Sequence, residues 1–153
     1  VAQNVIAADF FARAERVRKD LALEYLAGIT ARLVADEDDQ DVEWNLFSTY
    51  RGRLVLVSSA ELREYAQKAR CPYEYAVAGV VVAQLLVAVH PRLDFHDDRG
   101  CLFDRNDDRA GIVRVLKDPK IEDSCLKLMK PAGRPAALAI VEALRRYARG
   151  GGS

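Results

Sequence analysis

The chain has few of the side chains that most often carry chemistry. Its 153 residues include three cysteines and two histidines, and its 23 Lys and Arg balance 23 Asp and Glu. This balance argues against a nucleic-acid partner, since phosphate binding depends on clustered basic residues. The small cluster of Arg145, Arg146 and Arg149 fits the C-terminal end of a helix, where basic residues complement the helix dipole.

Several motifs are also missing. There is no G-x-S-x-G motif and no Gly-rich phosphate loop. Residues 1–20 carry Asp9 and Glu15 where a signal peptide has an apolar core, and the most apolar run, 76–89, is shorter than the roughly 20 residues that span a bilayer. Three widely spaced cysteines suit a reducing compartment. We therefore expect a cytoplasmic protein with no membrane segment and no nucleic-acid partner.

Hydropathy patterns predict an α+β fold with a small mixed sheet early in the chain and helices later. An amphipathic helix is expected over 8–27, followed by strands over 29–35, 43–50 and 53–57. The last two strands form a hairpin near Arg51 and Gly52. LVLV at 54–57 is apolar on both faces, which predicts a central, buried strand.

The second half of the chain reads as helical. Ser58 with Glu61 matches a capping box for a helix that ends near residue 69. The nearly all-apolar run 73–89 predicts a buried central helix that Pro91 ends. Shorter helices are expected after Asp107 or Asp108, around Cys125, and from Pro135 to Tyr147. We expect one domain over 1–149, with 150–153 as a linker or tail.

The stretch LVAVHPRLDFHDDRGC, residues 86–101, holds both histidines and the second cysteine. Zinc peptidases commonly use two histidines one helical turn apart, with a Glu beside the first. Here Leu86 lies one turn before His90, and Val87 follows it, so neither a second ligand nor a base is present there. His90 and His96 could be ordinary surface or capping residues, or they could form a rebuilt metal site with a carboxylate such as Asp94 or Asp97.

This stretch resembles the HExxHxxGxxH motif of the archaemetzincins, a branch of the metzincin zinc peptidases. His90 and His96 fall on the second and third histidines, whereas Leu86 replaces the first histidine, Val87 the general-base Glu, and Leu93 the Gly. LAGIT at 26–30 resembles the first core strand of the same family, and NLFSTYRGRLVLVSSAELREY at 45–65 resembles its strand pair leading into a helix. The resemblance covers roughly residues 24–130.

The same family has a second, structural zinc site formed by cysteines and ending in CxxC. Cys101 lies where one of these cysteines is expected. EDSC at 122–125 is similar to the CxxC, with Glu122 in place of its first cysteine and Cys125 retained. The fourth ligand could correspond to Asp97 or Asn106.

The resemblance implies a metzincin-like (zincin-like) fold without a catalytic residue, in other words a bacterial pseudoenzyme that acts as a protein-interaction or regulatory module. A zinc ion, vestigial or structural, would be its only cofactor. The candidate metal ligands are His90, His96, Cys101, Glu122 and Cys125. Two alternatives stay open: a metal-dependent hydrolase or peptidase rebuilt around His90 and His96, and a purely structural domain.

The last predicted helix could also bind a partner. Its apolar stripe comprises Leu138, Ile140, Val141 and Leu144. Such a stripe closes a core or offers a docking face for a protein partner or for a second copy in a homo-oligomer.

Overall fold

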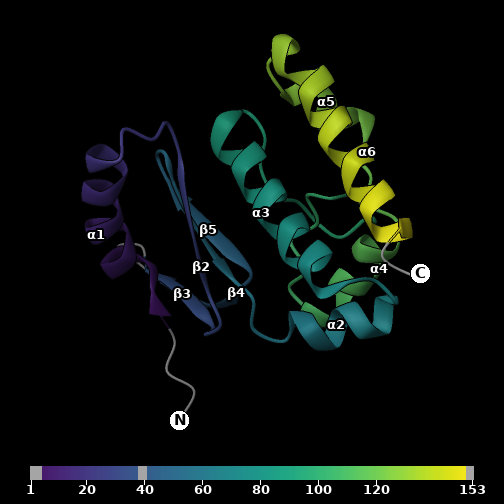
Figure 1. Cartoon of the computed structure of the whole chain (residues 1–153), viewed down its shortest axis with the longest axis horizontal. Coiled ribbons are helices and arrows are strands. Elements are labelled where there is room, and N and C mark those ends of the chain that lie inside the picture. The colour runs from purple at the N-terminus through teal and green to yellow at the C-terminus, as the bar shows by residue number, and fades with distance from the viewer. Residues whose placement is uncertain (1–4, 38–40, 151–153) are drawn as a thin grey trace. The chain divides into compact units, whose positions relative to one another are not determined.

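The computed structural model describes residues 5–37 and 41–150. The chain divides into two compact units, Val1–Ala60 and Glu61–Ser153, and we describe each by itself. Small mixed sheets lie in the first unit and most of the helices lie in the second, which confirms the α+β class (Figure 1). A single domain over 1–149 stays a prediction. The predicted tail lies outside the described residues, apart from Gly150, which ends the last helix.

The first unit pairs a helix with two small sheets. Its elements are β1 (Val5–Ile6), α1 (Ala7–Asp20), β2 (Leu26–Thr30), β3 (Val34–Glu37), β4 (Val42–Leu46), β5 (Ser48–Arg51) and β6 (Leu54–Ser58). The strand orders are β1-β3-β4 and β2-β6-β5, and each sheet contains one parallel and one antiparallel pair. All five residues of β6 are buried between two neighbouring strands, which confirms the central strand.

In the first unit, the structure corrects the predicted ends of one helix and one strand and confirms the predicted hairpin. The helix predicted to run to 27 ends at Asp20, because Ala22 adopts a φ of 52° and the Leu23 amide folds back to the Arg18 carbonyl. The strand predicted over 29–35 is two strands interrupted at 31–33. The hairpin is confirmed, with Gly52 at a φ of +59° between antiparallel β5 and β6.

The second unit is helical throughout its regular structure. Its elements are α2 (Leu62–Ala69), α3 (Tyr73–Val89), a 3₁₀ turn (Arg109–Gly111), α4 (Ile112–Lys117), α5 (Asp123–Leu128), a second 3₁₀ turn (Pro131–Gly133) and α6 (Arg134–Gly150). Asp108 caps the first 3₁₀ turn through the Ala110 amide, as the sequence predicted. α3 and α6 pack against each other within this unit.

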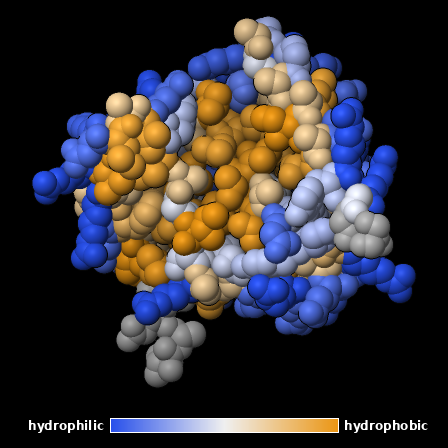
Figure 2. Space-filling view, viewed as in Figure 1, coloured by the Kyte–Doolittle hydropathy of each residue, from blue (hydrophilic) through white to orange (hydrophobic). Residues whose placement is uncertain are grey.

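The core of the second unit is built around α3, whose apolar residues gather into one cluster with the loop that follows it. In Figure 2 apolar side chains collect where Figure 1 draws α3. Gln84, the one polar residue in the middle of this helix, is 1% exposed. The helix ends at Val89, two residues before Pro91, which confirms the predicted buried helix and its end.

The predicted capping box at the start of α2 is wrong. Ser58 belongs to β6, and its hydroxyl donates to the Arg32 carbonyl at 2.7 Å within the first unit. The N-cap is Glu61 itself, at a φ of 63°, and its side chain accepts from the Tyr65 hydroxyl instead of an amide of the helix. The S-x-x-E match therefore does not form a capping box, because Ser58 is the last residue of strand β6 and not the N-cap of α2.

Candidate metal centre

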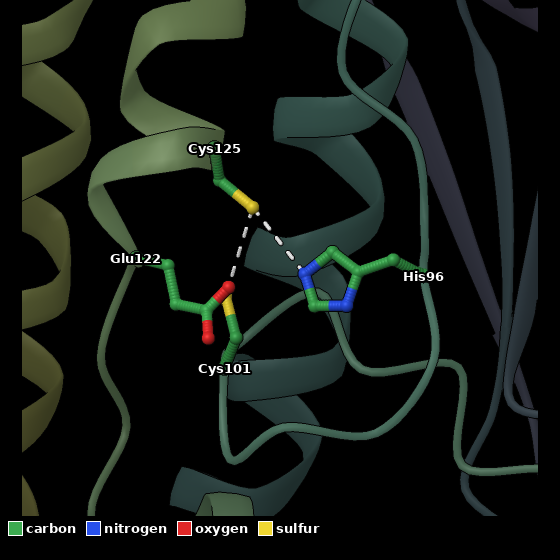
Figure 3. Close-up of side chains that lie close together, drawn as sticks. All are labelled: His96, Cys101, Glu122 and Cys125. Atoms are coloured by element: carbon green, nitrogen blue, oxygen red, sulfur yellow. Dashed lines mark hydrogen bonds between the residues drawn. The ribbon is translucent and has the colours of Figure 1, made fainter.

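Four side chains from two separate segments converge in the second unit. One potential ligand atom from each of His96, Cys101, Glu122 and Cys125 lies within 4.8 Å of all the others (Figure 3). The Cys101 and Cys125 Sγ atoms are 3.9 Å apart, and the Cys125 Sγ is 3.3 Å from the His96 Nε2. Ligands of a tetrahedral zinc ion are about 3.3–3.8 Å apart, given bonds of roughly 2.0–2.3 Å. The cluster is thus close to the size that such an ion needs.

The first segment is the loop that follows α3, and a buried carboxylate shapes it. The Asp104 side chain has no exposed surface. It accepts hydrogen bonds from the backbone amides of Arg99, Gly100 and Cys101 at 2.9, 2.7 and 3.1 Å. The loop turns at Gly100, whose φ is +83°. Together these contacts fix the backbone from which Cys101 projects, because each amide finds an acceptor in a place that water does not reach.

The same loop fixes the His96 ring. Its Nδ1 lies 2.8 Å from the Asp97 carbonyl oxygen. A carbonyl can only accept, so Nδ1 carries a proton, and Nε2 is the ring nitrogen that faces Cys125. A hydrogen bond from the second ring nitrogen to a backbone carbonyl is the usual support of a histidine that binds a metal through the first.

The second segment is the beginning of α5. Glu122 is the N-cap residue and Cys125 lies in the first turn, so the helix presents both side chains on one side. Cys101 and Cys125 are 0% and 2% exposed. Burial, followed by the neighbouring Cys101 and the Glu122 charge, raises the pKa of the Cys125 thiol to about 12. An adjacent cation would reverse this, because a coordinating thiol loses its proton.

Glu122 also contacts two residues outside the cluster. Its Oε2 is 3.3 Å from the Nε of Arg99, and it also accepts from the Ser124 hydroxyl at 3.5 Å. The Glu122 side chain is 28% exposed and that of Arg99 is 49% exposed. The Glu122 carboxylate is therefore within reach of both the other three ligands and the exposed guanidinium of Arg99.

The structure places His90 apart from the group formed by the other four predicted ligands. His90 is 3% exposed, and its Nδ1 accepts the backbone N–H of Lys130 at 3.1 Å. A Cβ built on Gly133 would lie 2.6 Å from the ring, so this glycine gives the imidazole its space. Burial, and then the Lys130 charge, lowers the pKa of His90. These contacts describe a neutral histidine packed into the fold.

The positions one turn before His90 are occupied by core residues. Leu86 and Val87 are 8% and 1% exposed and belong to the apolar cluster around α3. Neither side chain can bind a metal or accept a proton, as the sequence indicated. Neither residue considered for a rebuilt site belongs to the cluster of four ligands: the Asp94 side chain accepts from the Phe95 amide, and the Asp97 backbone carbonyl contacts the His96 ring.

Sequence reasoning missed two features of this centre. The sequence offered Asp97 and Asn106 as the fourth ligand beside the two cysteines and Glu122, but the structure puts His96 in that position. The side-chain amide of Asn106 instead donates to the backbone carbonyl of Asp104. The role of Asp104 was also missed. An acidic residue three positions after Cys101, in a loop with a glycine, was the available signal, since short acidic side chains often close such loops through backbone amides.

Comparison with protein-family models, curated proteins and solved structures gives no match to this chain. Among the described residues, no single helix is long and apolar enough to cross a membrane. Only α2 and α3 taken together reach that length and composition, and they bend by 110° where they join.

Proposed function

We propose that this chain is a non-catalytic, metzincin-like domain whose second unit is stabilised by a zinc ion. The convergence of His96, Cys101, Glu122 and Cys125 from two segments is the observation that supports this most directly. Thiolates with an imidazole favour zinc over magnesium or calcium, which prefer oxygen ligands. The ion would tie the loop after α3 to the beginning of α5.

Two observations favour a structural role over a catalytic one. Four protein ligands fill a tetrahedral zinc ion, whereas catalytic sites usually keep a position for water. The residues at the positions of the family's first histidine and general base are Leu86 and Val87, both part of the core. A missing general base alone removes a contribution on the order of a hundred- to ten-thousandfold.

The outer side of α6 supports an interaction role for such a domain. Val141 and Leu144 are buried in the second unit, whereas Leu138, Ile140 and Tyr147 are 48%, 39% and 52% exposed. The apolar stripe predicted from the sequence is thus split between core and surface. A protein partner or a second copy of the chain would cover the exposed residues.

The test is the zinc content of purified protein by elemental mass spectrometry, after reloading with zinc and removal of the excess. We expect about one zinc ion per chain, because a preformed four-ligand site holds its ion tightly. Cys125→Ala should lose it, whereas His90→Ala and the control Cys71→Ala, which removes a cysteine outside the cluster, should keep it. Zinc that depends on His90, or peptidase activity that a chelator abolishes, would contradict the proposal.

A further inference from the structure

The four ligands of the proposed zinc site differ in their access to solvent. Both sulfur atoms come from cysteines that are at most 2% exposed. The His96 side chain is 18% exposed and the Glu122 side chain is 28% exposed. A molecule from solution would therefore approach the site from the side of the imidazole and the carboxylate.

The ligands also differ in how firmly the fold holds them. Cys101 follows backbone that the buried Asp104 organises, and the Asp97 carbonyl orients the His96 ring. Cys125 lies inside α5. Outside the cluster, and among the described residues, the Glu122 side chain contacts Arg99 at 3.3 Å and Ser124 at 3.5 Å. A single carboxylate is also the hardest donor of the set, and borderline-soft metals favour thiolates and imidazole.

Arg99 could pair with the Glu122 carboxylate if that carboxylate left the ion. Its guanidinium already lies 3.3 Å from Oε2, so the carboxylate could leave a bound ion and keep its charge paired. The incoming ligand should then be an anion, because it replaces one negative charge with another in the coordination shell while Arg99 balances the displaced carboxylate. It should be small, since both cysteines beneath the site are packed in the core.

We propose that Glu122 is the exchangeable ligand of this site and that a small monovalent anion takes its coordination position while the carboxylate pairs with Arg99. The inference rests on the proposed zinc site. One carboxylate–metal bond breaks, one anion–metal bond forms, and His96, Cys101 and Cys125 keep their places. Arg99 is a positioning residue in this exchange, since it acts through Glu122.

The test uses the whole chain loaded with Co²⁺, whose visible spectrum reports coordination, and sodium azide as the probe anion. In the unchanged protein we expect a saturable spectral change on adding azide. Glu122→Ala vacates the position and should bind azide about tenfold more tightly, and Arg99→Ala should weaken azide binding by about tenfold, as for a residue that orients a ligand. Glu122→Cys supplies a third thiolate and should make the spectrum insensitive to azide.

The outcomes separate the two proposals. If no variant shows a thiolate-to-cobalt charge-transfer band, the metal site itself is wrong. If the band is present and the unchanged protein does not respond at azide concentrations that saturate Glu122→Ala, Glu122 is a fixed ligand and the exchange is wrong. An equal response of the unchanged protein and Glu122→Cys would also overturn it, because azide would then bind elsewhere.

Discussion

The C-terminal end of α3 and the loop that follows it make an instructive comparison, because the resemblance expected metal ligands in both. At the end of α3, Leu86 and Val87 are core residues and His90 is buried against backbone. A few residues later, His96 and Cys101 present an imidazole and a thiol to the beginning of α5. The end of α3 presents apolar core residues at these positions, whereas the loop contributes two of the four potential ligands.

Under the proposed metzincin-like assignment, the difference between these regions corresponds to one site lost and another kept. A helix that no longer presents ligands becomes more stable when apolar residues fill the same positions, at roughly 1.5–3 kcal/mol for each buried aliphatic side chain. The loop 96–104 also packs Leu102 and Phe103 into the core, but its turn depends on hydrogen bonds to Asp104 and, in our proposal, on an ion. Stability should therefore respond to metal in one region and to packing in the other.

Metal removal should have the largest effect. Binding of zinc to the folded state alone contributes about 4 kcal/mol at a free concentration a thousandfold above Kd. We expect a chelator to lower the unfolding temperature of the zinc-loaded protein and to leave Cys125→Ala, already without metal, unaffected. Differential scanning calorimetry with and without chelator measures this, with Cys71→Ala as the matched cysteine control. Equal unfolding temperatures of the zinc-loaded and zinc-free proteins would contradict the idea that the loop after α3 depends on metal.

Placing a Glu at position 87, where the resemblance expects the general base, should also be costly. Val87 is 1% exposed, so Val87→Glu buries a carboxyl group among apolar side chains and should destabilise the fold by about 4 kcal/mol. Urea unfolding gives the value, and Val87→Ile serves as an apolar control of different size. Zinc content should be unchanged in any Val87→Glu protein that folds. A stable variant with new peptidase activity would mean that the end of α3 is still a working site.

Asp104→Asn tests the loop without replacing a ligand; the carboxylate it alters also lies 3.7 Å from the His96 Nδ1 and 3.3 Å from the Arg114 guanidinium. The amide keeps the size of the carboxylate but has one oxygen to accept where three backbone amides donate. We expect a loss of about 1–3 kcal/mol from imperfectly paired buried groups and a zinc affinity about 10- to 100-fold lower. Competition with a chromophoric chelator measures the affinity. Unchanged zinc binding would mean that Asp104 does not position the ligands.

His90 should give the smallest effect, a dependence of stability on pH. Burial lowers the pKa of folded His90, whereas the unfolded side chain titrates near its usual value of about 6.5. Below that pH the unfolded chain binds a proton that the folded chain resists, so stability decreases as the pH falls. Urea titrations of zinc-free protein between pH 7.5 and about 5 should show a shallower dependence in His90→Asn. Identical slopes would show that His90 is accessible in its protonated form.

Strong local patterns predicted much of the fold. The apolar run of α3, the hairpin at Gly52 and the short helix at Cys125 all follow from residues close in sequence. The capping box failed because Ser58 is held in β6, where its hydroxyl donates to the Arg32 carbonyl, and α2 begins only at Leu62.

The candidate centre was predicted less completely for the same kind of reason. Cys101, Glu122 and Cys125 could be assigned to one site from a resemblance. The position of His96 beside them depends on the path of a loop that turns at Gly100 and closes on Asp104, and no local pattern encodes that path. The spacing of the two histidines instead suggested that His96 belongs with His90.

The most direct test of the account is the X-ray absorption spectrum of the zinc-loaded protein at the zinc edge. We predict two sulfur ligands at about 2.3 Å and two nitrogen or oxygen ligands at about 2.0–2.2 Å, with the same spectrum in His90→Ala. A shell of nitrogen and oxygen alone, or a spectrum that changes when His90 is removed, would contradict the assignment of the metal to His96, Cys101, Glu122 and Cys125.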